Sequence, residues 1–204
     1  MLDGIHEDLN RVKKKPYIED EDCDGTNDEV DAITAWSHYL QRNRSIVVDL
    51  FQGQLRNTMT CCECGHVNVK FDAFMYLSLP VSSRCNSLDD CLDLFCEEEL
   101  LSGDEQWYCP KCQTHVNATK KIDLFMLPPI LIIHLKRFKF SKYGQKSKIN
   151  RSIRYLLNDW DLSHAKKSQG GLYPLYDLYA VSHHLGGVSS GHYTGRFTLC
   201  LLVE

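Results

Sequence analysis

The chain has 204 residues, enough for one substantial domain with a hydrophobic core. It is 43% hydrophobic and 25% charged, which is typical of a globular protein rather than a disordered or fibrous one. A net charge of −4 argues against a nucleic-acid binder held mainly by phosphate contacts. The longest apolar run, residues 128–133, is too short to span a membrane. We therefore expect neither nucleic acid nor a membrane as a partner.

The first part of the chain and one later segment predict helices. Apolar residues recur at spacings of three and four at Leu2, Ile5, Leu9 and Val12. This pattern predicts a helix that is ended by Pro16. Two further helices are predicted over residues 27–43 and 86–96. In the last of these, Ser87 and Asp90 have the spacing of a capping box, with Asp in the usual Glu position.

The rest of the chain is dominated by segments that favour strands. Stretches rich in β-branched and aromatic residues cover residues 46–51, 67–71, 75–81, 122–127, 130–138, 176–182 and 193–197. A glycine-rich loop over residues 186–191 joins the last two. Helices gather at the start and strands follow, so the predicted fold class is α+β.

Ten cysteines stand out in this composition. The first residues show no secretory signal, so we expect an intracellular protein, cytoplasmic or nuclear. Disulfides are rare in reducing compartments, which favours metal binding or catalysis for these thiols. Cys91 is an exception, because it falls on the apolar face of its predicted helix and is expected to be a small core residue.

Two Cys-x-x-Cys pairs predict a structural zinc site. The four thiols are Cys61, Cys64, Cys109 and Cys112, and residues 65–108 separate the pairs. Two such turns complete a tetrahedral Cys₄ shell, which has no open position for a water molecule. The alternatives are unrelated core cysteines or a redox pair. Cys62 is an alternative ligand to Cys61.

The nine histidines have different expected roles. His134 lies in an apolar strand and is predicted to be a core residue. His66 and His115 follow the two cysteine pairs and are alternative ligands. Surface positions are expected for His6, His38 and His164. His192 differs from all of these, because a glycine-bounded loop delivers it to the start of a strand where its imidazole can face a cleft.

Several motifs together resemble the catalytic domain of the ubiquitin-specific proteases, which are papain-like cysteine peptidases that remove ubiquitin. The motifs, in chain order, are residues 2–11 (LDGIHEDLNR), 50–54 (LFQGQ), 74–80 (FMYLSLP), 127–138 (LPPILIIHLKRF) and 191–194 (GHYT). The resemblance covers almost the whole chain. It implies a papain-like fold with a β-rich palm and zinc-ribbon fingers that hold ubiquitin.

The resemblance also implies a division of the chain and a set of site residues. The fingers correspond to about residues 52–72 and 104–125, the palm to the remainder of 1–204, and most of the helical thumb is missing. His192 is implied to be the general base. The residues implied to line the channel for the ubiquitin tail are His184, Gly191 and Tyr193.

Two elements of the family pattern are missing from these 204 residues. The box with the nucleophilic cysteine is expected upstream of the first helix, and the segment that orients the histidine is expected after Thr194. Cys23 lies among acidic residues that suppress its thiolate, and a strand would carry Cys200 far from His192. We therefore expect this polypeptide alone to be inactive. It is expected to be the C-terminal part of a deubiquitinase that hydrolyses bonds after the ubiquitin C-terminal glycine.

The resemblance leads to one structural expectation and leaves one alternative function. A missing thumb is expected to leave apolar surface exposed at Leu2, Ile5 and Leu9. The alternative function is a non-catalytic ubiquitin-binding module or pseudoenzyme that uses the same surfaces for interaction alone.

Overall fold

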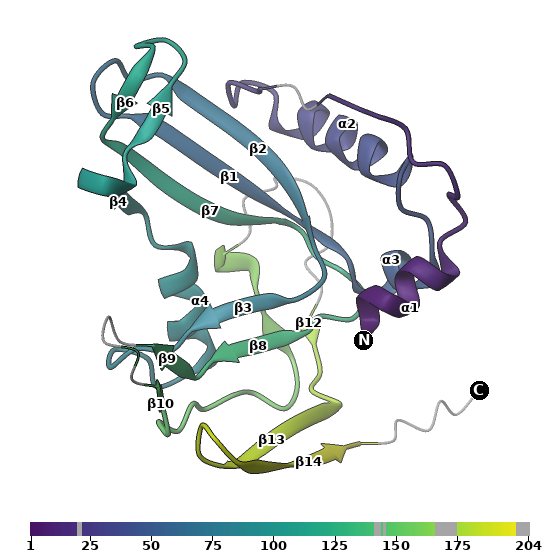
Figure 1. Cartoon of the computed structure of the whole chain (residues 1–204). Helices are drawn as coiled ribbons and strands as arrows, with labels where there is room; N and C mark the ends of the chain where they lie inside the picture. Colours follow the sequence, from purple (N-terminus) through teal and green to yellow (C-terminus); the bar gives the residue numbers. More distant parts are fainter. Residues whose placement is uncertain (20–21, 141–143, 145, 166–174, 199–204) are drawn as a thin grey trace.

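The computed structural model describes residues 1–19, 22–140, 144, 146–165 and 175–198. It is a strand-rich α+β structure, as predicted (Figure 1). Long strands run diagonally across the upper half of the view, with a helix alongside them, and shorter strands and one helix lie below. No helix within the described ranges is long and apolar enough to cross a membrane.

The largest sheet has four antiparallel strands in the order β2-β1-β7-β4. Their bounds are Val67–Phe74 for β2, Gly53–Cys61 for β1, Ala118–Met126 for β7 and Glu99–Leu101 for β4. β1 is the central long strand, paired on both sides. The small hairpin β5 (Trp107–Cys109) and β6 (Thr114–Val116) lies at the far end of these strands (Figure 1).

Three helices precede this sheet in the chain. α1 (Leu2–Leu9) packs on α3 (Ile46–Phe51), and α2 (Asp28–Leu40) lies along β2. A buried ion pair fixes the start of α2 to the sheet: Arg56 Nε on β1 lies 2.7 Å from Asp28 Oδ2. The Arg56 side chain is only 6% exposed, so the guanidinium depends on this carboxylate for its charge partner.

The main hydrophobic core lies below the long sheet. It packs α4 (Leu88–Cys96) on the parallel pair β3 (Leu77–Pro80) and β8 (Ile133–Lys136). Leu92 and Cys91 are fully buried in it, which confirms the core position predicted for Cys91. The capping box is also confirmed. Ser87 Oγ accepts from the Asp90 N–H, and Asp90 Oδ2 accepts from the N–H of Ser87 and of Asn86.

Three two-stranded ladders complete the lower part of the molecule. They are β9 (Phe138–Phe140) with β10 (Lys146–Lys148), β11 (Trp160–Asp161) with β12 (Leu175–Tyr176), and β13 (Ala180–Gly186) with β14 (Gly191–Phe197). Two single 3₁₀ turns span Gly103–Glu105 and Ser163–Ala165. The β13–β14 hairpin lies at the bottom of Figure 1, below β9 and β10.

Three predictions of local structure were wrong. Residues 46–51 form the helix α3 rather than a strand, because Ser45 Oγ caps it by accepting from the Val48 N–H at 3.3 Å. The first helix ends at Leu9, well before Pro16, because the Asn10 side chain bonds to neighbouring backbone groups instead of letting the helix continue. Residues 130–138 are not a buried run, since inward and exposed side chains alternate along β8.

Two histidines differ from their predicted environments. His6 is not a surface residue: it is 3% exposed, with Nδ1 2.8 Å from Ser45 Oγ and Nε2 3.2 Å from Asn43 Oδ1. His134 is exposed rather than in the core, and its Nδ1 lies 3.0 Å from Ser78 Oγ on the paired strand. On α1, the expected apolar exposure is present at Ile5 and Leu9, which are 42% and 50% exposed, whereas Leu2 is half-buried.

Candidate functional site

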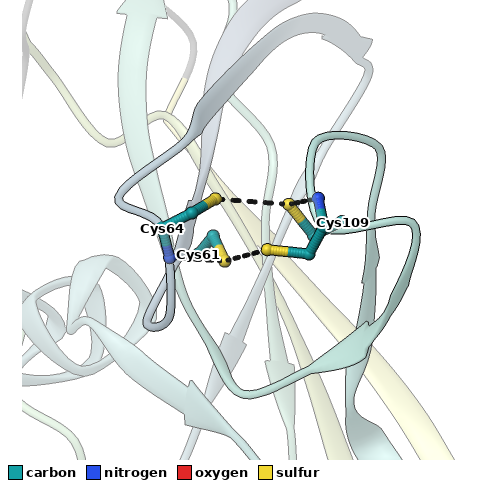
Figure 2. Close-up of side chains that lie close together, drawn as sticks. Cys61, Cys64 and Cys109 are labelled. Atoms are coloured by element: carbon teal, nitrogen blue, oxygen red, sulfur yellow. Dashed lines mark hydrogen bonds between the residues drawn. The ribbon is translucent and has the colours of Figure 1, made fainter.

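The two cysteine pairs meet at the end of the long strands. Cys61 and Cys64 occupy the turn after β1, and Cys109 and Cys112 occupy the turn between β5 and β6 (Figure 2). All four Sγ atoms lie within 4.8 Å of one another. Cys61 Sγ is 3.9 Å from Cys112 Sγ, and Cys64 Sγ is 3.7 Å from Cys109 Sγ. The chain thus forms a four-cysteine cluster able to hold a metal ion.

The spacing of these thiols fits a tetrahedral metal ion. A Zn–S bond of about 2.3 Å places two sulfurs of a tetrahedron about 3.8 Å apart, close to both contacts in the cluster. Each turn also donates a backbone N–H to its first sulfur, from Cys64 to Cys61 Sγ and from Cys112 to Cys109 Sγ, both at 3.4 Å. These N–H donors favour thiolates, the form in which cysteine binds metal.

The cluster also distinguishes the alternative ligands. Cys62 is exposed and lies outside the group, so Cys61 is the member of that pair in the cluster. His66 stacks on Trp107 at 6.3 Å, and His115 packs edge-on against Tyr108 at 5.4 Å. Neither histidine belongs to the group of four.

The four thiols perturb one another's pKa values. The Cys64 N–H lowers the pKa of Cys61 to about 7, and hydrogen bonding to the Cys64 sulfur raises the pKa of Cys112 to about 12. Two thiols this close cannot both ionise easily, because their negative charges would repel each other. The pKa of one is therefore lowered and that of the other raised. The cluster lies in a small hydrophobic group of its own with Val116 and Trp107, separate from the main core.

The other candidate residues lie on the β13–β14 hairpin. Its register pairs Leu185 with His192 and His184 with Tyr193. Directly paired residues of antiparallel strands face the same side, and successive residues face opposite sides. His192 therefore shares a face with Leu185, and His184 shares the other face with Tyr193.

Three of the sequence-predicted residues come into contact. The His184 and Tyr193 rings lie 4.7 Å apart. A Cβ at Gly191 would lie 2.1 Å from His184 Nε2 and 2.7 Å from the Leu185 carbonyl oxygen, so only glycine fits there. Sequence reasoning missed one member of this group: Phe138 of β9 packs edge-on against His184 at 5.7 Å. No local pattern links residues so far apart in the sequence.

His192 stands apart from these rings. It is exposed, and no described side chain or backbone group makes a hydrogen bond to its imidazole. A groove of about 860 Å³ lies on the same face of the hairpin, and its lining includes Leu185, His183 and Thr194. Tyr155 and Leu157, which precede the hairpin in the chain, also line it. The cross-strand partner of His192, Leu185, thus lines the groove, whereas His192 itself is not among the lining residues.

The described thiols outside the cluster lie in other parts of the molecule. Cys91 and Cys85 are fully buried in the main core. Burial raises the pKa of Cys91 to about 12 and that of Cys96 to about 11. The Cys23 backbone pairs with Val69 on β2. Cys62 is the exception, because it is next to Cys61 of the four-cysteine cluster. Cys200 lies outside the described residues.

Comparison with known proteins gives a consistent result. The family model described as ubiquitin carboxyl-terminal hydrolase matches residues 1–199. Ubiquitin carboxyl-terminal hydrolase 2 from Homo sapiens is 39% identical over 197 residues, which cover 95% of this chain and 32% of that protein. Ubiquitin carboxyl-terminal hydrolase Usp2 from Drosophila melanogaster is also 39% identical, over 94% of this chain and 20% of that protein. The chain therefore spans about a third or less of the length of these two relatives.

Solved structures share the fold. One chain of the SAGA Ubp8/Sgf11/Sus1/Sgf73 DUB module bound to ubiquitin aldehyde aligns with a TM-score of 0.66 and 23% identity, covering 85% of this chain and 41% of that one. A yeast SAGA DUB module structure aligns with a TM-score of 0.67 and 26% identity, covering 78% and 35%. The family model matches nearly the whole chain, and the chain accordingly belongs to the ubiquitin carboxyl-terminal hydrolase family, as a ubiquitin-specific protease homologue.

Proposed function

We propose that these 204 residues are the ubiquitin-binding, histidine-bearing C-terminal part of a thiol-dependent deubiquitinase. The reaction would be hydrolysis of the bond after the ubiquitin C-terminal glycine. The observation that carries the proposal is the β13–β14 hairpin, which presents an exposed imidazole at His192 directly across from Leu185, a residue that lines a groove. Family membership supplies the chemistry for which such an imidazole is suited.

In this reaction His192 would accept the proton of a cysteine thiol while the thiolate attacks the carbonyl carbon of the scissile bond. The proton would then pass to the leaving amine, which balances the acylation step. On the other face of the hairpin, the surface formed by His184, Gly191 and Tyr193 would contact the extended ubiquitin tail. Tyr193 is 66% exposed and so has apolar area to offer.

We further propose that a polypeptide of these residues alone does not hydrolyse ubiquitin conjugates. Cys85 and Cys91 are fully buried, the four cluster thiols face one another, and Cys62 lies with them at the opposite end of the molecule from the hairpin (Figure 1). Cys96 is half-buried against the main core, and the Cys23 backbone pairs with Val69 of β2, so no described thiol is placed to serve His192. An imidazole without a thiolate partner or an orienting side chain has nothing to activate.

Zn²⁺ is the metal we propose for the four-cysteine cluster, because soft thiolates in a tetrahedral arrangement select it. With four protein ligands it would have no catalytic position and would hold the two turns together. The long strands and the cluster, about residues 52–72 and 104–125, would then be the fingers, and the rest the palm. Free thiols in this number fit an intracellular protein, in cytoplasm or nucleus.

Two measurements on the zinc-loaded chain test this function. Calorimetric titration with ubiquitin should show reversible 1:1 binding, and Tyr193→Ala should weaken it. Tyr17→Ala is the matched control, since Tyr17 is an 88% exposed tyrosine far from the hairpin in sequence. Ubiquitin truncated before its C-terminal tail should bind less tightly than intact ubiquitin to the parent chain, and equally to the parent chain and to Tyr193→Ala.

The second measurement uses ubiquitin with a C-terminal electrophile. We expect no covalent adduct with the chain alone. An adduct that His192→Ala abolishes would contradict the proposed inactivity. Absence of any ubiquitin binding by a folded, zinc-loaded chain would contradict the proposed function as a whole, including the alternative of a purely ubiquitin-binding module.

A further inference from the structure

Lys148, at the end of β10, makes two contacts that the proposed reaction does not use. Its Nζ donates to the carbonyl oxygen of His184 and to that of Gly186, each at 2.9 Å. Both acceptors are on β13. Carbonyl groups two residues apart in a strand point to the same side, so one ammonium group bridges two successive acceptors on a single strand edge.

The residue between these two carbonyls is Leu185, the cross-strand partner of His192. Lys148 therefore holds the backbone on both sides of the position that lies directly opposite the proposed general base. In the described strand order β13 has β14 as its strand neighbour on one edge, so its other edge is open to a side chain such as Lys148. Within the described residues, Lys148 is the side chain that donates to both of these carbonyls.

A second contact from the same ladder strengthens the attachment. Lys148 is paired with Phe138 in the β9–β10 register. The Phe138 ring packs edge-on against His184, the residue whose carbonyl Lys148 binds. Lys148 thus binds the backbone of His184, and its ladder partner Phe138 packs against the His184 ring.

The β9–β10 ladder is itself fixed to the palm. Ile149, next to Lys148, packs against the main core, and its N–H donates to the Arg137 carbonyl at 2.7 Å. Arg137 in turn donates to the carbonyls of Ile149 and Arg151 at 3.2 and 2.6 Å. A continuous path of packing and hydrogen bonds leads from the core through Lys148 to the hairpin.

We propose that Lys148 is a positioning residue: with Phe138 it clamps β13 to the palm and so sets the position of His192, which is paired with β13 through Leu185. The inference rests on the proposed role of His192. It adds a residue that touches neither the imidazole nor the groove, and acts only through the backbone of the hairpin.

Amide hydrogen exchange of the zinc-loaded chain tests the clamp directly. Lys148→Met keeps the aliphatic stem and removes the ammonium, and should speed exchange in residues 180–197 by about tenfold, the effect of losing hydrogen bonds to a charged donor. Exchange in β1, β2 and β7 should not change. Lys148→Arg retains charged donors and should keep exchange in the hairpin slow.

Lys139→Met is the matched control, because it removes the same charge from an exposed lysine of the partner strand β9. Equal hairpin exchange in Lys148→Met and Lys139→Met would overturn the proposal. So would faster exchange across the whole molecule, which would indicate a general loss of stability, or a hairpin that is already unprotected in the parent chain.

A second readout follows the imidazole itself. The ring resonances of His184 and His192 should move in Lys148→Met, whereas those of His66 and His115 beside the metal cluster should not. Neither measurement contains ubiquitin. Failure of the clamp therefore leaves the proposed function standing, and failure of ubiquitin binding leaves the clamp to be judged on exchange and ring shifts alone.

Discussion

The ion pair between Asp28 and Arg56 gives a sharp test of how α2 is held on the long sheet. We consider Asp28→Asn, which removes the carboxylate charge and leaves the guanidinium 6% exposed without a charge partner. Breaking a fully buried pair in this way costs about 3–5 kcal/mol. The Asp28 side chain is 23% exposed, so water compensates part of the loss and we expect about 2–3 kcal/mol.

Asp31→Asn is the matched control, because Asp31 is also an acidic residue in the first turn of α2. Both substitutions lose the same interaction with the helix dipole, worth about 0.3–1 kcal/mol. The difference between their unfolding free energies therefore isolates the ion pair. Urea denaturation of the zinc-loaded chain, followed by far-UV circular dichroism, measures both. A difference below about 0.5 kcal/mol would refute the view that the pair anchors α2.

Three further outcomes are expected. Metal analysis should find one zinc per chain in the parent protein and in Cys62→Ser, but not in Cys61→Ser; retention of zinc by Cys61→Ser would show that the cluster is not the binding site. Leu92→Ala should lower the unfolding free energy by about 3 kcal/mol, because Leu92 is fully buried in the main core, and a loss under 1 kcal/mol would mean that the site collapses around the gap. Backbone N–H groups lower the pKa of Asp90 from its ordinary 3.8, so the ionised carboxylate stabilises the fold at neutral pH, and this stabilisation is lost as the pH falls through the folded pKa. Asp90→Asn should therefore have a lower unfolding free energy than the parent at pH 7, and the difference should vanish in acid. A difference that does not depend on pH would contradict stabilisation by the Asp90 carboxylate.

Local signals in the sequence predicted much of this structure. Each Cys-x-x-Cys turn, the capping box at Ser87 and the glycine-bounded hairpin depend on a few neighbouring residues, so the geometry of each is contained in a short segment. The meeting of the two cysteine pairs was predicted from their matching spacing, because a tetrahedral metal site needs four ligands. The error over residues 46–51 arose from a conflict between two local signals. β-branched residues favoured a strand, but the Ser45 cap and packing against α1 favoured a helix.

Burial of individual histidines depended on contacts that no local pattern reveals. His6 is covered by residues around Ser45, 39 positions away, whereas His134 points outward because β8 has one exposed side. The clamp at Lys148 joins residues 36 positions apart. Such pairs are set by how the chain folds back on itself, and a single sequence carries no direct signal of them.

The separation of the small hydrophobic group around the cysteine cluster from the main core has a consequence for how the molecule unfolds. Two separate cores need not melt together, since each can open at its own free energy. Because metal binding supplies much of the stability of such small units, withdrawal of the ion is expected to loosen the β5–β6 tip first while α4 and its neighbours stay folded. The supply of one metal ion would then control whether the β5–β6 hairpin is ordered, while the β13–β14 hairpin at the other end of the molecule stays folded.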